Sequence, residues 1–256
     1  KSDHKKKFKK DVRRMIRMMR VAIAVSPKLR RVGNPIALLT HVEDYTTREL
    51  DLRNEISGGN ELMEIRDSLV DDFPMPTLKF PKYYPELSNE YVLVSEFVTG
   101  KTLEERIVDE DLPWDYLIEL FRIHGAYMFG IGTFHGDLHP GNCLIDDKGD
   151  FVFIDNGAIC QAPRGVSLPL FEFFENLSKG RLDDAFEALL GLAEERPSED
   201  RVARFKTRMT EIYQGFGEKS VGEQSLTDLM MKTVRTAVED AGADFGEEAF
   251  PIIRSL

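Results

Sequence analysis

The chain has 256 residues, of which 42% are hydrophobic and 31% charged. This composition is typical of a folded globular protein and excludes an extended disordered chain, and the length allows one large core or two lobes. The two cysteines, Cys143 and Cys160, are too few for a disulfide framework or a four-thiolate metal site, so we expect a reducing, cytoplasmic environment.

Charge is distributed unevenly along the chain. Residues 1–31 carry 13 Lys and Arg against 2 Asp and Glu, whereas the remaining residues carry 21 against 43. The acidic bulk argues against nucleic acid as a partner, because phosphate binding needs a basic surface. We expect no membrane-spanning segment, since no apolar run approaches the roughly 18 residues that a spanning helix needs.

The basic segment is predicted to form a helix. From Lys5 to Val25, apolar residues recur at helical spacing with Lys and Arg between them. A solvated surface helix explains this pattern, and so does a helix that lies on the anionic headgroups of a membrane. The second interpretation would place the protein peripherally at a membrane.

A helix and two strands are expected next. The helix begins near Thr46 with a Thr-x-x-Glu capping box and is weakened by the glycine pair at 58 and 59. Strand-like runs follow at 79–84 and 91–97, with a proline-led turn between them. These elements predict a small β-containing lobe over residues 1–98.

Residues 99–256 are predicted to form a helical lobe. A loop and a hairpin occupy Thr133 to Ile159. Helical periodicity occurs in six segments, namely Leu103 to Val108, Trp114 to Gly130, Leu168 to Ser178, Leu182 to Glu194, Glu199 to Tyr213 and Leu226 to Ala241. The predicted fold class is therefore α+β, with an incomplete small lobe followed by a helical lobe.

The hairpin region carries the residues that indicate chemistry. It reads His-Gly-Asp-Leu-His-Pro-Gly-Asn from His135 to Asn142, followed by two apolar runs around a polar turn and then Asp-Asn-Gly from Asp155. A turn centred on residues 148 and 149 would place Asn142 opposite Asp155. An amide oxygen and a carboxylate in that position can share a hard cation such as Mg²⁺.

Asp137 lies on the loop that leads into the hairpin, five positions before Asn142. A carboxylate there can orient a hydroxyl or water for in-line attack on a γ-phosphate. The spacing His-x-Asp-x-x-x-x-Asn followed by Asp-x-Gly is that of kinase phosphotransfer sites. We therefore predict an ATP and Mg²⁺ site with Asp137 as the catalytic residue and Asn142 and Asp155 as metal ligands.

Other interpretations of these residues are open. His135, Asp137 and His139 could hold zinc, although a histidine pair four residues apart needs a helix that the nearby Gly and Pro disfavour. Asp137 or Asn142 alone could be an ordinary turn residue. For His135 and His139 themselves, we expect a role in bracing the loop rather than in chemistry.

Three residues outside the motif are candidates by their place in chain order. Glu55 lies on the helix before the strands, where a protein kinase places the glutamate that pairs with its phosphate-binding lysine. Glu96 and Val98 lie between the small lobe and the helical lobe, where the backbone of a hinge could bind adenine. A solvated helix face and a plain connector explain these positions equally well in isolation.

Together these motifs resemble the UbiB/ADCK family of ABC1-type atypical kinases. The resemblance rests on the catalytic-loop motif, on Glu49-Leu50-Asp51 with Glu55, and on the run from Leu93 to Gly100. It implies a protein-kinase-like fold that binds ATP with Mg²⁺, hydrolyses ATP and phosphorylates proteins poorly. It also implies a role in quinone or other isoprenoid-lipid metabolism at membranes, with lipid-biosynthesis proteins as partners.

The resemblance assigns further roles. Asp137, Asn142 and Asp155 keep the roles given above. Glu55 matches the helix glutamate that binds the nucleotide lysine. Glu49, with the aspartate two positions on at Asp51, matches a regulatory E-x-D pair that contacts an N-terminal K-x-G-Q segment.

The chain departs from the family pattern at several positions. Asp-Asn-Gly from Asp155 stands in place of Asp-Phe-Gly, which loses an aromatic side chain, and Gly58 stands where the family has asparagine. No K-x-G-Q segment and no Val-Ala-x-Lys strand occur in the sequence. We expect the nucleotide lysine just upstream of Lys1, as in an excised piece of a longer protein.

Two other functions are open. A small-molecule kinase of the aminoglycoside or choline type shares the His-Gly-Asp-x-His-x-x-Asn motif. Such enzymes usually carry a longer insertion than the 39 positions that separate Glu96 from His135. A pseudokinase scaffold, which binds nucleotide weakly and recruits partners, is the alternative from another class.

Overall fold

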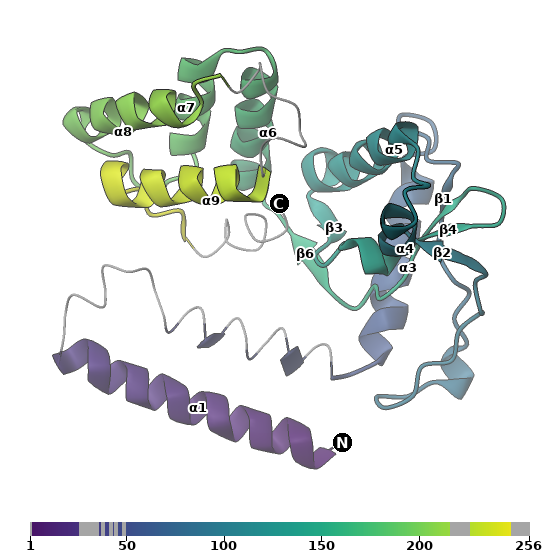
Figure 1. Cartoon of the computed structure of the whole chain (residues 1–256). Coiled ribbons are helices and arrows are strands. Elements are labelled where there is room, and N and C mark those ends of the chain that lie inside the picture. The colour runs from purple at the N-terminus through teal and green to yellow at the C-terminus, as the bar shows by residue number, and fades with distance from the viewer. Residues whose placement is uncertain are drawn as a thin grey trace. The chain divides into compact units, whose positions relative to one another are not determined.

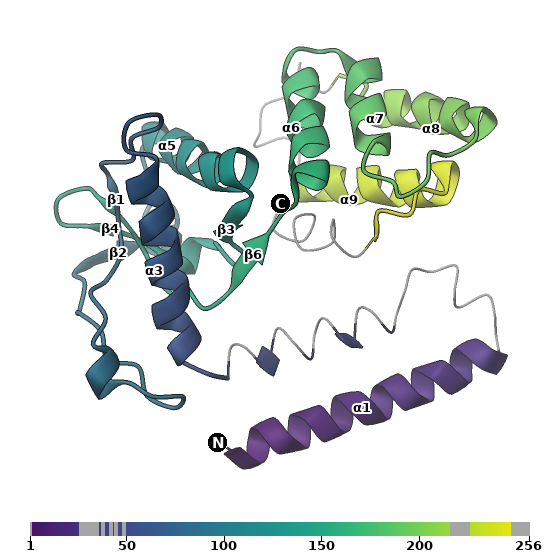
Figure 2. The same cartoon turned by 180° about the vertical axis from the view of Figure 1, so that it is seen from behind.

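The computed structural model describes residues 2–25, 36, 39, 40, 43, 46, 47, 50–215 and 226–246. The chain divides into two compact units (Figures 1 and 2). The first comprises Lys1–Ile123 and Asp137–Ile159, and the second comprises His124–Gly136 and Cys160–Leu256. The lobes proposed from the sequence, 1–98 and 99–256, stay a prediction.

Helix α1 spans Ser2–Val25 and confirms the helix predicted from Lys5. Its apolar positions share one side, where Val12 is buried and Phe8 and Met19 are half-buried. Among the described residues, no helix is both long enough and apolar enough to cross a bilayer.

Helix α3 spans Arg53–Ser68 and runs straight through its glycine pair. The predicted weakening there is wrong, because both glycines are buried under close neighbours. A Cβ on Gly58 would lie far closer to the Asn156 carbonyl oxygen than the 3.0 Å below which such contacts essentially never occur. A Cβ on Gly59 would lie 2.5 Å from the ring of Tyr83.

The start of α3 also differs from the prediction. Thr46 has helical backbone, but α3 itself begins at Arg53 after Leu52, which makes no side-chain cap. Glu49, the acidic member of the predicted capping box, lies outside the described residues. The structure therefore assigns the carboxylate-bearing helix a later start than the sequence pattern did.

A four-stranded sheet lies in the first unit, with the strand order β1-β5-β4-β2. Its strands are β1 (Leu78–Lys79), β2 (Gly100–Thr102), β4 (Cys143–Asp146) and β5 (Phe151–Phe153). β1 pairs with β5 in parallel, and the other pairs are antiparallel. The side chains of Leu78, Ile145 and Phe153 are buried in this part of the core.

The two strands predicted at 79–84 and 91–97 do not form as regular strands. A single antiparallel bridge joins Tyr83 to Ser95, with hydrogen bonds from Tyr84 N to Val94 O (3.0 Å) and from Glu96 N to Lys82 O (2.7 Å). Prolines at 81 and 85 supply no N–H group, which interrupts the ladder. The next regular strand, β2, begins at Gly100.

The β4–β5 hairpin is confirmed, but its register is one residue away from the prediction. Cys143 pairs with Phe153, and Ile145 pairs with Phe151. The loop holds three residues rather than two, because Gly149 adopts a left-handed backbone (φ +86°) and Asp146 N bonds to Asp150 O at 2.9 Å. A type I turn followed by a left-handed glycine is a common three-residue hairpin connection.

Short helices follow the sheet strands. α4 spans Leu103–Val108 and starts with a capping box in which Thr102 and Glu105 bond reciprocally. α5 spans Trp114–Gly125 and continues as a π-helical segment, Ala126–Ile131. The helix predicted from Trp114 to Gly130 is therefore present, with its last turns wound as a π-helix.

The second unit contains the two-stranded sheet of β3 (Thr133–His135) and β6 (Ile159–Gln161), and a group of helices. The helices confirm the predicted segments and are α6 (Arg164–Ser178), α7 (Leu182–Leu190), α8 (Glu199–Ile212) and α9 (Leu226–Thr236), which continues as a π-helical segment, Ala237–Ala241. Ring contacts of Phe186 with Phe205 and Tyr213 fill the core. Tyr213 also forms a 2.9 Å hydrogen bond with Thr233.

His124 gives the second unit a pH-dependent stability. Its ring packs edge-on against Phe134, and Nδ1 is buried without a hydrogen-bond partner. Burial lowers the pKa of His124 from 6.5 to about 4, and the charge of His135 contributes. The folded state keeps the imidazole neutral, while the unfolded chain binds a proton below its ordinary pKa.

The contribution of neutral His124 to the free energy of unfolding should therefore be fully present above pH 6.5 and be lost as the pH falls from 6.5 to about 4. We expect His124→Phe to remove up to about 3 kcal/mol of this loss. Urea unfolding of the wild type and the variant between pH 4 and 7 measures the effect. The same pH profile for both proteins would contradict this origin of the acid sensitivity.

Candidate nucleotide and metal site

The loop before the hairpin is held by its own side chains. Pro140–Asn142 forms a 3₁₀ turn, and the Nδ1 atom of His139 accepts a hydrogen bond from Gly141 N at 3.0 Å. The carbonyl oxygen of His139 accepts another from Asn142 N at 2.9 Å. His139 thus braces the loop, as one interpretation of the sequence predicted.

Asn142 is joined to Asp137 by its side chain. The Nδ2 atom of Asn142 donates to the Asp137 carbonyl oxygen at 3.0 Å, and the same oxygen accepts from His139 N at 2.9 Å. Asn142 is buried. Because the amide nitrogen is engaged with the loop, the amide oxygen is the atom that Asn142 can offer to a cation.

Asp155 and Asn142 lie on the two arms of the hairpin, near its open end. The carbonyl oxygen of Asn142 accepts from Ile154 N at 3.0 Å, so Asn142 pairs with the residue just before Asp155. The predicted direct pairing of Asn142 with Asp155 is wrong by this one residue. Asp155 itself has a left-handed backbone (φ +57°), so its exposed side chain does not follow the strand alternation.

Glu55 of α3 holds the turn that contains Asp155. Its Oε2 atom accepts from Gly157 N at 3.0 Å, and the side chain is only 8% exposed. Burial raises the pKa of Glu55 to about 7, aided by the charge of Asp155 and a hydrogen bond with it, and opposed by backbone hydrogen bonds from Gly157 and Asn156. Two adjoining carboxylates fit a cation, which relieves their mutual repulsion.

Asn156 points the opposite way from Asp155, into the protein. It is fully buried, and its Nδ2 atom donates to the Tyr83 hydroxyl and to the Phe153 carbonyl, both at 2.9 Å. Burial raises the pKa of Tyr83 to about 12, so the phenol stays protonated. Nothing in the sequence indicated that Tyr83 bonds to Asn156 or that Gly58 and Gly59 allow close packing against α3, since no local pattern marks these contacts.

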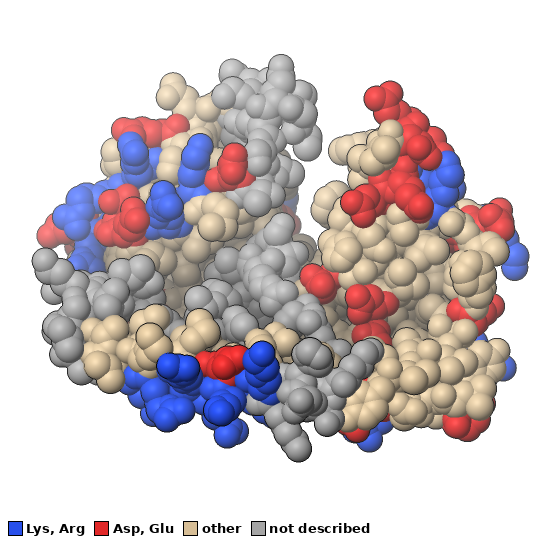
Figure 3. Space-filling model, turned by 60° about the horizontal axis from the view of Figure 1, so that its bottom comes forward, with Lys and Arg blue, Asp and Glu red and all other residues tan. Residues whose placement is uncertain are grey.

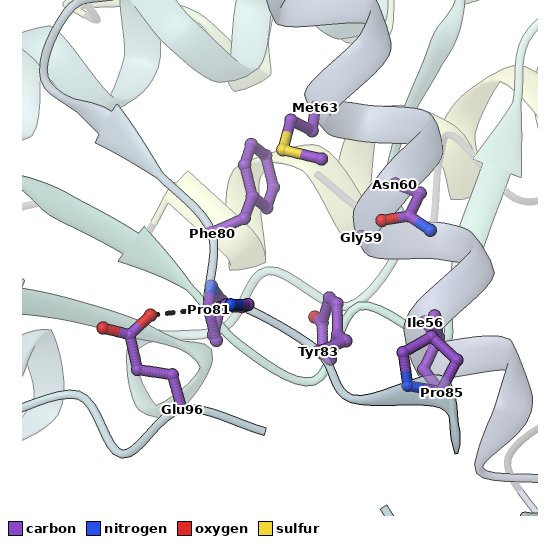
Figure 4. A pocket seen from close by; sticks show the side chains of 10 residues that line it. Ile56, Gly59, Asn60, Met63, Phe80, Pro81, Tyr83, Pro85 and Glu96 are labelled. Carbon is purple, nitrogen blue, oxygen red and sulfur yellow. Dashed lines mark hydrogen bonds between the residues drawn. The ribbon is translucent and has the colours of Figure 1, made fainter. Parts of the chain in front are cut away.

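Glu96 joins a different group of side chains. Its Oε2 atom accepts from Lys82 N at 3.2 Å, and it lines a pocket of about 320 Å³ beside α3 (Figure 4). Apolar side chains of Met63, Phe80 and Tyr83 line the same pocket. Val98 lies two residues further along and is half-buried.

The E-x-D pair is described only in part, because Glu49 lies outside the described residues. Asp51 accepts two hydrogen bonds from the Arg53 guanidinium, at 2.9 and 2.7 Å. These hydrogen bonds and the charge of Asp51 raise the pKa of Arg53. Asp51 and Arg53 thus form a local ion pair at the start of α3.

The zinc interpretation finds no support in the described residues, where no three His, Cys, Asp or Glu side chains are grouped to hold a metal ion. Asn142 and Asp155 remain the candidate oxygen ligands for a hard cation. Mg²⁺ is commonly held by one or two protein groups, with water and substrate phosphates completing the shell.

The fold and this loop-hairpin geometry define a protein of the kinase-like class. Residues 1–188 match the family model described as the ABC1 atypical kinase-like domain. The chain belongs to this family. A solved structure titled as the complex of Rv3197 with erythromycin from Mycobacterium tuberculosis shares the fold, with a TM-score of 0.52 and 21% identity over 79% of this chain and 50% of that one.

Curated relatives carry the name probable protein kinase UbiB. The protein from Vibrio vulnificus strain CMCP6 is 30% identical over 141 residues, which cover 54% of this chain and 25% of the relative. The protein from Aliivibrio fischeri strain MJ11 is 23% identical over 245 residues, which cover 89% of this chain and 42% of the relative. The chain thus spans less than half the length of these relatives.

Proposed function

We propose that the chain binds ATP with Mg²⁺ and transfers or hydrolyses its γ-phosphate, as an atypical kinase or ATPase. The observation that carries this proposal is the continuous set of contacts from Asp137 through Asn142 to the turn at Asp155. These contacts connect the proposed base, Asp137, with the proposed ligands Asn142 and Asp155. The three residues occur in the same chain order as in kinase phosphotransfer sites. The family match over residues 1–188 favours this function over a small-molecule kinase.

In this proposal each residue has one task. Asp137 orients the attacking hydroxyl or water, and Asn142 and Asp155 hold the cation. Mg²⁺, when bound, neutralises the charge that develops on the phosphate oxygens. Glu55 fixes the turn through Gly157 and, as the resemblance implies, also meets the nucleotide lysine. The backbone at Glu96 and Val98 is proposed to receive adenine.

The cellular role follows from the resemblance alone. We propose support of quinone or other isoprenoid-lipid metabolism, with lipid-biosynthesis proteins as partners. The pair Glu49 and Asp51 is proposed to regulate access to the site. Arg53 would then set the direction of the Asp51 carboxylate, because it binds both of its oxygens.

Asp137→Asn tests the proposed chemistry. We expect ATP turnover by the whole protein to fall at least about a hundredfold, because asparagine cannot accept the proton or orient the nucleophile as a carboxylate does. The affinity for Mg²⁺–ATP should stay within about threefold of the wild type, since the proposal assigns Asp137 to the nucleophile and not to the cation or the phosphates.

Steady-state turnover and calorimetric binding separate the two effects. Asp147→Asn, in the exposed hairpin turn, is the matched control and should change neither quantity. Turnover by Asp137→Asn equal to that of the control would contradict the catalytic role. Wild-type nucleotide binding without any turnover would instead support the scaffold alternative.

A second proposal concerns the basic helix α1. Lys7, Lys10, Arg14 and Arg17 are exposed and follow one another at helical spacing, opposite the buried Val12. Figure 3 shows a patch of Lys and Arg side chains at the bottom of the view. The exposed Val21 continues their row. We propose that this basic face lies on a membrane surface that contains anionic lipid.

Charge reversal tests this membrane proposal. Each cation near an anionic surface contributes about 1 kcal/mol, so Arg14→Glu with Arg17→Glu should weaken vesicle binding at least about thirtyfold. The control Arg204→Glu with Arg208→Glu changes the net charge equally on exposed positions of α8. Sedimentation with phosphatidylserine vesicles measures both, and equal loss in the two variants would contradict a specific role of α1.

A further inference from the structure

Asp155 and Asn156 are consecutive residues with opposite surroundings. Asp155 is exposed with a left-handed backbone, while Asn156 is fully buried. Asn156 is therefore one point at which this turn is fixed to the interior, beside the bond from Gly157 N to Glu55. A displacement of the Asn156 backbone would be passed to Asp155 through the peptide bond that joins them.

The direction of the Asn156 amide is set by its partners. Nδ2 donates to the Phe153 carbonyl, which can only accept, and to the Tyr83 hydroxyl. Exchanging the amide oxygen and nitrogen would bring two acceptors together at Phe153. Tyr83 is the distant partner, 73 positions away in the chain, and so it fixes the turn to another segment.

The two glycines of α3 make room for this arrangement. The backbone of Asn156 lies against Gly58. The ring of Tyr83 lies against Gly59 (Figure 4). A side chain at either position would separate Tyr83 or the turn from the helix. Gly58 and Asn156, two of the departures from the family pattern, are thus in contact with each other.

We infer that Tyr83 and Asn156 are positioning residues for the metal ligand Asp155, an inference that rests on the proposed function. Asn156 anchors the turn by hydrogen bonds, and Tyr83 supplies the bond that links the anchor to a separate segment. Neither residue touches the cation. Their loss should therefore weaken the dependence of nucleotide binding on Mg²⁺ more than it weakens the fold.

Tyr83→Phe is the mild test, because it removes only the hydroxyl. Tyr213→Phe is its control, since the Tyr213 hydroxyl also makes a side-chain hydrogen bond of 2.9 Å, to Thr233, although Tyr213 is buried and Tyr83 is half-buried. The readout is the ratio of ATP affinities with Mg²⁺ and with EDTA. We expect this ratio to fall about fivefold in Tyr83→Phe and to stay unchanged in Tyr213→Phe, with similar losses in Tm.

Asn156→Leu tests the anchor itself in the same assay. We expect the ratio to fall at least tenfold, and adding Tyr83→Phe to this variant should cause no further loss, because the hydroxyl has already lost its partner. Independent effects of the two substitutions on the ratio would contradict a joint action. If Asn156→Leu fails to fold, Tyr83→Phe against Tyr213→Phe still decides the matter.

The outcomes separate this inference from the proposed function. If the wild type and Tyr83→Phe show the same Mg²⁺ dependence while Asp155→Asn loses it, the positioning role is wrong and the metal site stands. If the wild type binds ATP equally with Mg²⁺ and with EDTA, the proposed function is wrong and the inference falls with it. An equal fall of the affinity ratio in Tyr83→Phe and Tyr213→Phe would show that the effect comes from a general loss of stability, and it would overturn the inference.

Discussion

Gly58→Ala is expected to destabilise the first unit and to disturb the candidate site together. The new methyl group would meet the carbonyl of Asn156 and the side chain of Ile159, the nearest being a backbone atom that cannot rotate away. Forced overpacking typically costs about 1–3 kcal/mol, and the gain in helix propensity returns at most about 1 kcal/mol. We therefore expect a net loss of stability and at least about tenfold weaker Mg²⁺–ATP binding, because the turn that carries Asp155 must shift.

Gly165→Ala in α6 is the matched control. It also replaces a helical glycine, but a Cβ there meets no atom within 4 Å. The free energy of unfolding of Gly165→Ala should stay the same or rise by less than about 1 kcal/mol. Thermal unfolding and calorimetric titration of both variants decide the question, and a Gly58→Ala protein that behaves like Gly165→Ala would show that α3 and the turn do not meet as described.

The helices were predictable from sequence because their signals are local. Apolar periodicity alone located α1 and the four helices α6 to α9, since each carries apolar side chains at helical spacing. The hairpin was also visible, as two apolar runs around a polar turn. Its register was not, because the choice between a two-residue and a three-residue loop depends on the left-handed backbone of Gly149.

The sheet was less predictable because its pairing is between distant segments. β1 is two residues long and pairs with β5, more than 70 positions away, and β2 pairs with β4 across 40 or more positions. No local period marks such short strands. The expected strand pair at 79–84 and 91–97 was drawn from β-propensity, which prolines at 81 and 85 override.

The candidate site was predictable where its residues lie close together in the chain. Asp137, Asn142 and Asp155 were found from spacing, and the structure joins their loop, hairpin and turn by hydrogen bonds. The contact of Glu55 with Gly157 spans 102 positions, and only chain order pointed to Glu55. Tyr83 gave no signal at all, because a tyrosine in a strand-like segment looks like any residue that packs against the core.

The metal site at Asp155 is tested most directly by Mg²⁺-dependent ATP binding of Asp155→Asn in the whole protein. Asparagine suits this position, because it tolerates the left-handed backbone of Asp155 and keeps the size of the side chain. It removes the charge that the cation needs. It also removes the repulsion between two adjoining carboxylates, so Tm without Mg²⁺ should not fall.

We expect calorimetry to show at least about a hundredfold weaker ATP binding in the presence of Mg²⁺, with unchanged binding in EDTA. Asp147→Asn, which makes the same chemical change in the exposed hairpin turn, should bind Mg²⁺–ATP like the wild type. If Asp155 holds the cation, Asp155→Asn alone should lose its Mg²⁺-dependent affinity for ATP, and its Tm should not fall. Wild-type Mg²⁺–ATP affinity in Asp155→Asn would contradict it.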